Sequence, residues 1–147
     1  MKIHTIGFTE KSAESFFSLL KKSGAKRIVD VRLNNYSQLS GFAKKDDLRY
    51  FLKEICDIDY VHLPDLAPTK EMLQPYQKGS LTWEQYENLY LNLMAKRNIE
   101  KYTKPEIIED SCLLCSEHLP HKCHRRLLTN YLKDHWSNYK IDVDHLF

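Results

Sequence analysis

The chain has 147 residues, of which 42% are hydrophobic and 29% charged, and its formal net charge is +2 at pH 7. This length suits one domain with its own core, and the near balance of charge excludes binding to nucleic acid through the whole surface. Apolar runs are too short to span a membrane, and residues 1–7 lack the apolar region of a signal peptide. We therefore expect a cytoplasmic protein whose four cysteines are reduced thiols.

Short apolar runs alternate with helical patterns along the chain. Residues 3–7 predict a first strand, and a helix follows with Thr9 as its N-cap and Gly24 at its end. Further strands are predicted at residues 27–32, 60–63, 112–115 and 141–146.

The segments between these strands predict amphipathic helices and one long loop. One helix has its apolar face at Leu48, Phe51, Leu52 and Ile55. Residues 65–80 contain Pro68, Pro75 and Gly79, and they predict an irregular segment, with at most one helical turn, long enough to be a lid or binding loop. Thr82 and Gln85 match a capping box that begins a long helix. A last helix follows residue 122, with its apolar positions at Leu127, Leu128, Tyr131 and Leu132.

This alternation predicts a single three-layer α/β domain over residues 1–147, with a mainly parallel sheet of about five strands and helices on both faces. In such sheets ligands bind beyond the carboxyl ends of the strands. We therefore expect the side chains that follow the strands to converge, and His145 to join them if the last strand is parallel. The converging residues are Gly7, Thr9, Asp30, Arg32, residues 64–66, Cys115 and Glu117.

The last predicted helix opens with several cations and no acidic residue: Lys122, His124, Arg125 and Arg126. A helix N-terminus carries partial positive charge, so such a start costs stability unless an anion lies nearby. Backbone N–H groups together with Arg125 and Arg126 make a site of phosphate or carboxylate size. A solvated basic helix end is the alternative interpretation.

Two cysteines flank this helix start. Cys115 lies where a strand meets its loop, an arrangement that also presents the nucleophile of cysteine phosphatases and rhodaneses, although His121 stands where their loop arginine would be. Cys123 lies at the helix start, where the dipole favours a thiolate. The alternatives are a packed, unreactive Cys115 and a half-buried helix-cap Cys123. Cys112 and Cys115 are three positions apart in a strand and point to opposite faces, so we do not predict a redox pair there.

Charged and imidazole side chains near the same places are candidates for proton transfer. Asp30 and Arg32 share one face at a strand end, where they form either a simple salt bridge or a base and an oxyanion partner. Glu117 is a candidate acid or base, or alternatively neutralises Arg125, and His124 is a further candidate.

The central segment also contains enough ligands for tetrahedral zinc: Cys115, His118, His121, Cys123 and His124. Their spacing matches no zinc motif with a paired half-site, so we assign no metal ligand. Nothing matches a P-loop or a dinucleotide-binding glycine motif, so we predict no cofactor.

Five short motifs along the chain can be compared as a set with known families. They are Thr5-Ile6-Gly7, Asp30-Val31-Arg32, Ser37 and Phe42, Tyr60 with His62-Leu63-Pro64, and Leu113-Leu114-Cys115-x-Glu117-x-x-Pro120-x-x-Cys123-His124-Arg125. They resemble the family known as domain of unknown function 488 over nearly the whole chain. After Leu66 this chain has Ala67-Pro68, where relatives usually have glycines. The resemblance implies a compact α/β domain in a bacterial or archaeal cytoplasm, and it implies no established reaction.

The leading functional hypothesis is an enzyme that acts on a phosphate-bearing substrate, such as a nucleotide or a nucleic-acid end. The candidate anion-binding residues are Thr9, Arg32, Arg125 and Arg126. The candidate nucleophiles are Cys115 and Cys123, and the candidate proton-transfer groups are Asp30, Glu117 and His124. The alternatives are a non-catalytic module that binds nucleic acid or a phosphorylated partner, and a zinc-stabilised scaffold.

Overall fold

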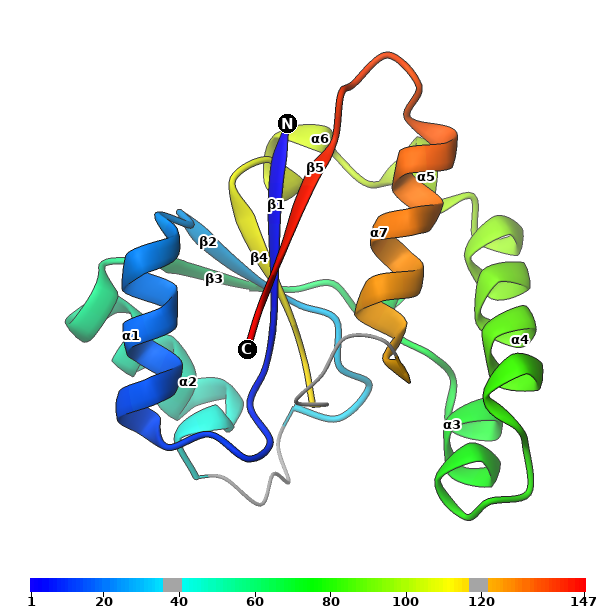
Figure 1. The fold of residues 1–147 in the computed structure, drawn as a ribbon, viewed down its shortest axis with the longest axis horizontal. Coiled ribbons are helices and arrows are strands. Elements are labelled where there is room, and N and C mark those ends of the chain that lie inside the picture. Colours follow the sequence, from blue (N-terminus) through cyan, green and yellow to red (C-terminus); the bar gives the residue numbers. More distant parts are fainter. Residues whose placement is uncertain (36–40, 117–121) are drawn as a thin grey trace.

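The computed structural model describes residues 1–35, 41–116 and 122–147. Five parallel strands form one sheet in the order β3-β2-β4-β1-β5 (Figure 1). The strands are β1 (Lys2–Gly7), β2 (Arg27–Asp30), β3 (Asp59–His62), β4 (Ser111–Cys115) and β5 (Asp142–Leu146). The predicted α/β fold is therefore confirmed. Within the described ranges, every helix is too short or too polar to cross a membrane.

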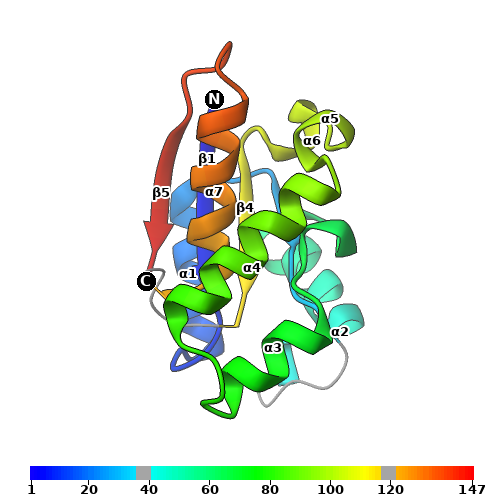
Figure 2. The same cartoon turned by 90° about the vertical axis from the view of Figure 1, so that its right-hand side faces the viewer.

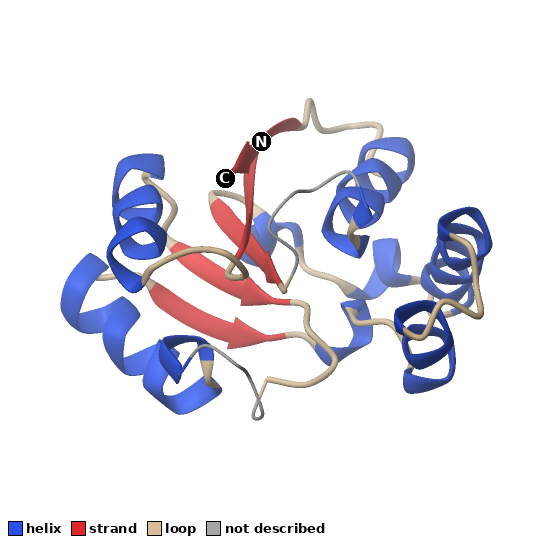
Figure 3. Ribbon diagram, turned by 60° about the horizontal axis from the view of Figure 1, so that its bottom comes forward, coloured by secondary structure: helices blue, strands red, loops and turns tan. Residues whose placement is uncertain are grey.

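Helices cover both faces of this sheet (Figures 1 and 3). One face carries α1 (Ala13–Ser23) and α2 (Lys45–Phe51), and the other carries α3 (Lys70–Gln77), α4 (Trp83–Lys96), α5 (Ile99–Tyr102), α6 (Pro105–Ile108) and α7 (His124–His135). Figure 2 shows α7, α4 and α3 in front of the sheet. Because side chains alternate along a strand, Cys112 packs on the α1 side and Cys115 on the α7 side, on opposite faces as predicted.

The parallel register brings the strand ends to one edge. Gly7 lies opposite Cys115, and Asp30 lies opposite both Leu114 and His62. The neighbouring strands β1 and β4 lead into α1 and α7, which lie on opposite faces of the sheet. Such a switch of direction is where open α/β sheets form their ligand crevice. The carboxyl ends of β1, β2, β3 and β4 therefore meet at one edge of the sheet.

The start of α1 differs from the prediction. The helix begins at Ala13, and the Ser12 hydroxyl, not that of Thr9, accepts the capping hydrogen bond, from the Ser15 N–H at 3.1 Å. Thr9 instead donates both its N–H and its hydroxyl to the carbonyl of Ser116, which ties the loop after β1 to the loop after β4. The predicted cap was wrong because this contact between distant loops takes Thr9 out of the helix. Gly24 ends the helix as expected, in the left-handed conformation at φ 76°.

Residues 65–80 are more regular than predicted. They contain the helix α3, with Pro75 inside it, after a 3-10 turn at Pro64–Leu66. Met72 is buried, and the Tyr76 ring stacks on that of Tyr86 with centroids 4.7 Å apart. These tertiary contacts offset the hydrogen bond that Pro75 removes. The predicted irregular loop was therefore wrong.

A π-helical segment at Leu52–Cys56 continues α2. Its wider turn takes Ile55 off the apolar face, so that Ile55 is 43% exposed although the sequence pattern predicted it to be buried. The capping box of Thr82 and Gln85 is confirmed, and so is the absence of an acidic residue from the first turn of α7.

Candidate functional site

A cavity of about 600 Å³ opens at the carboxyl edge of the sheet, on the α7 side. Residues after β2, from α3, after β4 and from the start of α7 form its wall: Arg32, Leu33, Asn34, Pro68, Lys70, Leu73, Gln74, Gln77, Cys115, Ser116, Cys123 and His124. The described part of this wall carries no carboxylate and two cationic side chains, Lys70 and Arg32, of which Arg32 is paired with Asp30.

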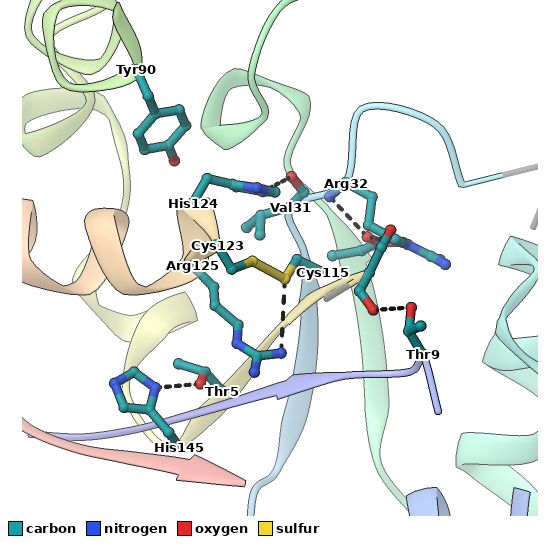
Figure 4. Close-up of a disulfide and its surroundings, with 12 residues drawn as sticks. Thr5, Thr9, Val31, Arg32, Tyr90, Cys115, Cys123, His124, Arg125 and His145 are labelled. Atoms are coloured by element: carbon teal, nitrogen blue, oxygen red, sulfur yellow. Dashed lines mark hydrogen bonds and ion pairs between the residues drawn. A yellow bond between two sulfur atoms is a disulfide. The ribbon is translucent and has the colours of Figure 1, made fainter. Parts of the chain in front are cut away.

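Cys115 and Cys123 are joined in a disulfide at this wall (Figure 4). Cys115 is the last residue of β4, and Cys123 is the N-cap of α7. The expectation of four free thiols is wrong for this pair, because the fold brings a strand end and a helix start together, which their separation in sequence does not reveal. Cys56 and Cys112 are free thiols.

The side chain of Arg125 lies next to the disulfide. Its side chain is fully buried, and its Nη1 donates to Cys115 Sγ at 3.8 Å. Figure 4 shows the guanidinium between Cys115 and the hydrogen-bonded pair of Thr5 and His145. A buried cation is thus in contact with the sulfur of Cys115.

Asp30 and Arg32 form a buried salt bridge. Arg32 donates its Nε to Asp30 Oδ1 at 2.8 Å and its Nη2 to Asp30 Oδ2 at 2.7 Å, and its Nη1 reaches the Ala43 carbonyl at 2.7 Å. The Tyr60 hydroxyl donates to Asp30 Oδ2 at 2.6 Å. Both carboxylate oxygens and three guanidinium nitrogens are therefore committed to holding the end of β2, which is the simpler of the two interpretations drawn from sequence.

His124 completes the connection between α7 and β2. Its Nε2 lies 2.8 Å from the Val31 carbonyl oxygen. A carbonyl only accepts, so Nε2 carries the proton and Nδ1 is the acceptor of the neutral ring. His62 makes a matching contact, with Nε2 donating to the Arg32 carbonyl at 2.9 Å. Two imidazoles thus fix the backbone that follows β2.

The remaining candidates are not gathered at the cavity wall. Thr9 is exposed and bonded to Ser116, and Arg126 lies over the Trp83 ring at 5.8 Å. Glu117 lies outside the described residues, as do His118 and His121. In the ranges that the structure describes, no three His, Cys, Asp or Glu side chains are grouped as metal ligands would be.

The model of a family described as "Domain of unknown function DUF488" matches residues 12–132. The chain belongs to this family. The matched range begins after β1 and ends within α7, so it contains β2, β4 and the helix start that form the cavity wall. Neither the curated proteins nor the solved structures give a match to this chain.

The field of Arg125 extends across the carboxyl edge of this DUF488 domain. Burial, followed by the charge of Arg125, lowers the pKa of Lys11 to about 8. Burial and then the charges of Arg125 and Arg126 lower the pKa of His145. Each of these groups loses positive charge more easily than usual, mainly because burial disfavours the charged form and further because neighbouring cations repel it. The same field favours an anionic sulfur or an anionic ligand.

His124 predicts a pH dependence of stability. Burial lowers its pKa to about 4 from a value of 6.5. Between these values the unfolded chain binds a proton that the folded chain does not, so stability falls as pH falls through this window. Relative to neutral pH, we expect a loss of about 2 kcal/mol at about pH 5.

Urea unfolding of the wild type and of His124→Gln at the two pH values measures this effect. Glutamine keeps an N–H donor for the Val31 carbonyl and does not titrate, so the variant should lose about 2 kcal/mol less than the wild type between the two conditions. An equal loss of stability in both proteins would show that a group other than His124 causes the pH dependence.

Sequence reasoning missed the contribution of α3 to the cavity. Lys70, Gln74 and Gln77 line it from one face of that helix. Their spacing of four and three residues is typical of one helix face. Pro75 nevertheless favoured the prediction of a loop for this segment. The role of Tyr60 was also missed, since its bond to Asp30 depends on the pairing of β2 with β3.

Proposed function

We propose that this DUF488 domain binds a phosphate-bearing substrate in the cavity at the carboxyl edge and acts on it through Cys115 in its thiol form. The observation that carries the proposal is the wall of the cavity. Its described residues include Lys70 and two cysteines but no carboxylate. The Arg125 guanidinium contacts the sulfur of Cys115. The wall therefore combines a site for an anion with a nucleophile.

Cys115 is the better candidate nucleophile because two positive fields act on it. The Arg125 guanidinium donates to its sulfur, and the N-terminus of α7 begins at the adjacent Cys123. Both favour a thiolate, which is the reactive form of cysteine. A reducing cytoplasm, the location that we propose, would keep the pair as thiols.

The proposed reaction is phosphoryl transfer. The Cys115 thiolate attacks phosphorus, so that an S–P bond forms while the ester P–O bond breaks and the leaving oxygen takes a proton. Water then attacks phosphorus, which releases phosphate and restores the thiolate. His124 is neutral at pH 7 because burial lowers its pKa to about 4, so it does not supply that proton. Glu117 stays the predicted donor.

The size and polarity of the cavity favour a nucleotide over a smaller ester. A cavity of about 600 Å³ is within the range that holds a small organic ligand. Lys70 provides charge for the phosphate, and the amides of Asn34, Gln74 and Gln77 provide donors and acceptors for a sugar or a base. Arg32 and Asp30 hold the wall in place and neutralise one another.

Phosphate release from p-nitrophenyl phosphate and from nucleoside monophosphates, measured with protein kept reduced by a dithiol, tests the proposal. We expect release by the wild type, loss of release in Cys115→Ser, and normal release in the matched control Cys112→Ser. Lys70→Gln should raise KM several-fold with little change in kcat. An inactive reduced wild type, or an active Cys115→Ser, would contradict the enzyme proposal.

The full burial of Cys115 favours a second candidate, a binding module without chemistry. Calorimetry with nucleoside monophosphates separates the two candidates. Salt-sensitive binding that survives Cys115→Ser and Cys123→Ser, without phosphate release by the wild type, would identify a module. Stoichiometric zinc in the purified protein would instead favour the scaffold alternative.

A further inference from the structure

Cys115 and Cys123 cannot act as nucleophiles while they are bonded to each other. In this form Cys115 has no exposed surface and Cys123 is 3% exposed. We propose that the two cysteines are a hydroperoxide-reactive pair whose oxidation to a disulfide stops the proposed reaction in the cavity. The regulatory part of this inference rests on the proposed function.

Two different elements of one core cluster position the two sulfurs. Cys115 ends β4, which pairs with β1 on one side and β2 on the other. Cys123 is the N-cap of α7, and that helix is anchored on the sheet by buried Leu127, Leu128, Tyr131 and Leu132. The positions of the sulfurs are therefore set by packing that does not depend on the bond. The pair can open and close without unfolding either element.

The other two cysteines lack these features. Cys112 faces the opposite side of the sheet, and Cys56 lies in the π-helical segment that follows α2. Burial raises the pKa of both thiols, which favours their protonated form. Cys115 is as buried as Cys112, and it differs in accepting a hydrogen bond from the Arg125 guanidinium. Arg125 donates to Cys115, so peroxide chemistry is directed to that sulfur.

The oxidant of the proposed chemistry is hydrogen peroxide. The Cys115 thiolate attacks one peroxide oxygen, the O–O bond breaks, and Cys115 becomes a sulfenic acid while hydroxide leaves and is protonated to water. The Cys123 sulfur then attacks Cys115 Sγ, the S–O bond breaks, and a second water leaves with the proton of Cys123. An external dithiol returns two electrons and two protons through thiol–disulfide exchange.

Oxidation removes the nucleophile that the proposed reaction needs. It consumes the lone pair with which Cys115 would attack phosphorus, because that pair forms the bond to Cys123. The cavity itself is present in the disulfide form. Oxidised protein should therefore release no phosphate until a dithiol restores both thiols.

Stepwise addition of hydrogen peroxide to the reduced full chain tests the pair by intact mass. The wild type should lose two hydrogens and regain them with dithiol. Cys123→Ser lacks the second sulfur, so it should stop at the sulfenic acid, which dimedone labels at Cys115. The matched control Cys112→Ser should behave as the wild type. A dimedone adduct on the wild type comparable to that on Cys123→Ser, or oxidation of Cys56 or Cys112 before Cys115, would overturn the pair.

Phosphate release by the same two forms then tests the switch. Release by reduced protein that stops on oxidation and returns with dithiol supports it, and equal release by both forms overturns it. Absence of phosphate release by the reduced protein overturns the proposed enzyme and the switch with it, whereas the mass series tests the reactive pair and does not depend on turnover.

Discussion

Replacing Arg125 with methionine is expected to slow the alkylation of reduced Cys115 by iodoacetamide about ten- to hundredfold at neutral pH, because a cation in contact with a sulfur favours its thiolate. Arg125 is fully buried and its Nη1 is 3.8 Å from Cys115 Sγ, so solvent screens this effect little. Mass spectrometry of alkylated peptides over a pH series measures the rate at each cysteine. The midpoint of the Cys115 profile should move to higher pH in the variant.

The adjacent residue offers a matched control. Arg126→Met removes the same charge one position along α7, but Arg126 is half-buried and lies over the Trp83 ring. Its effect on Cys115 alkylation should be at most about twofold. Arg125→Lys keeps the charge and should retain most of the wild-type alkylation rate. It therefore separates the effect of the charge from any disturbance of folding by methionine. Equal rates in wild type and Arg125→Met would show that the guanidinium does not activate Cys115.

Replacing Asp30 with asparagine should lower the free energy of unfolding by about 3–5 kcal/mol, since it leaves the buried Arg32 guanidinium without its counter-charge. Asp30 has no exposed surface, and Arg32 is 2% exposed. Urea unfolding at neutral pH measures the loss.

Asp59 provides the comparison, at the start of the neighbouring strand. It is exposed and paired with Lys53 at 3.4 Å, so Asp59→Asn should cost less than about 1 kcal/mol. Removing both buried charges in Asp30→Leu with Arg32→Met should recover part of the loss. A loss below about 1 kcal/mol for Asp30→Asn would mean that the pair does not hold the end of β2.

The overall fold could be predicted because its signals are local. Apolar runs and helical spacing identified the strands and the helices that bury a stripe of side chains, and the capping box of Thr82 and Gln85 marked the start of α4. The helix α3 was missed for the same reason: Pro75 is a local signal against a helix, whereas the stacking of Tyr76 on Tyr86 is a tertiary one. Packing between distant residues decided that segment.

The site could be predicted in part. The acid-free start of α7 and the cysteine at the end of β4 pointed to the edge at which the cavity opens, because parallel strands end together. The sequence could not show that Cys115 and Cys123 touch, nor that Arg125 turns inward to the sulfur while Arg126 turns outward to Trp83. The cysteine contact and the directions of the two arginines depend on how α7 packs against the sheet.

We propose that Cys115 and the start of α7 share one anion-binding cavity. A crystal structure of the reduced protein soaked with tungstate, whose metal is located by its anomalous signal, tests it most directly. We expect tungstate in the cavity, against the sulfur of Cys115 and beside His124 and Lys70. Tungstate bound only at other surfaces, with the cavity empty and both cysteines reduced, would contradict it.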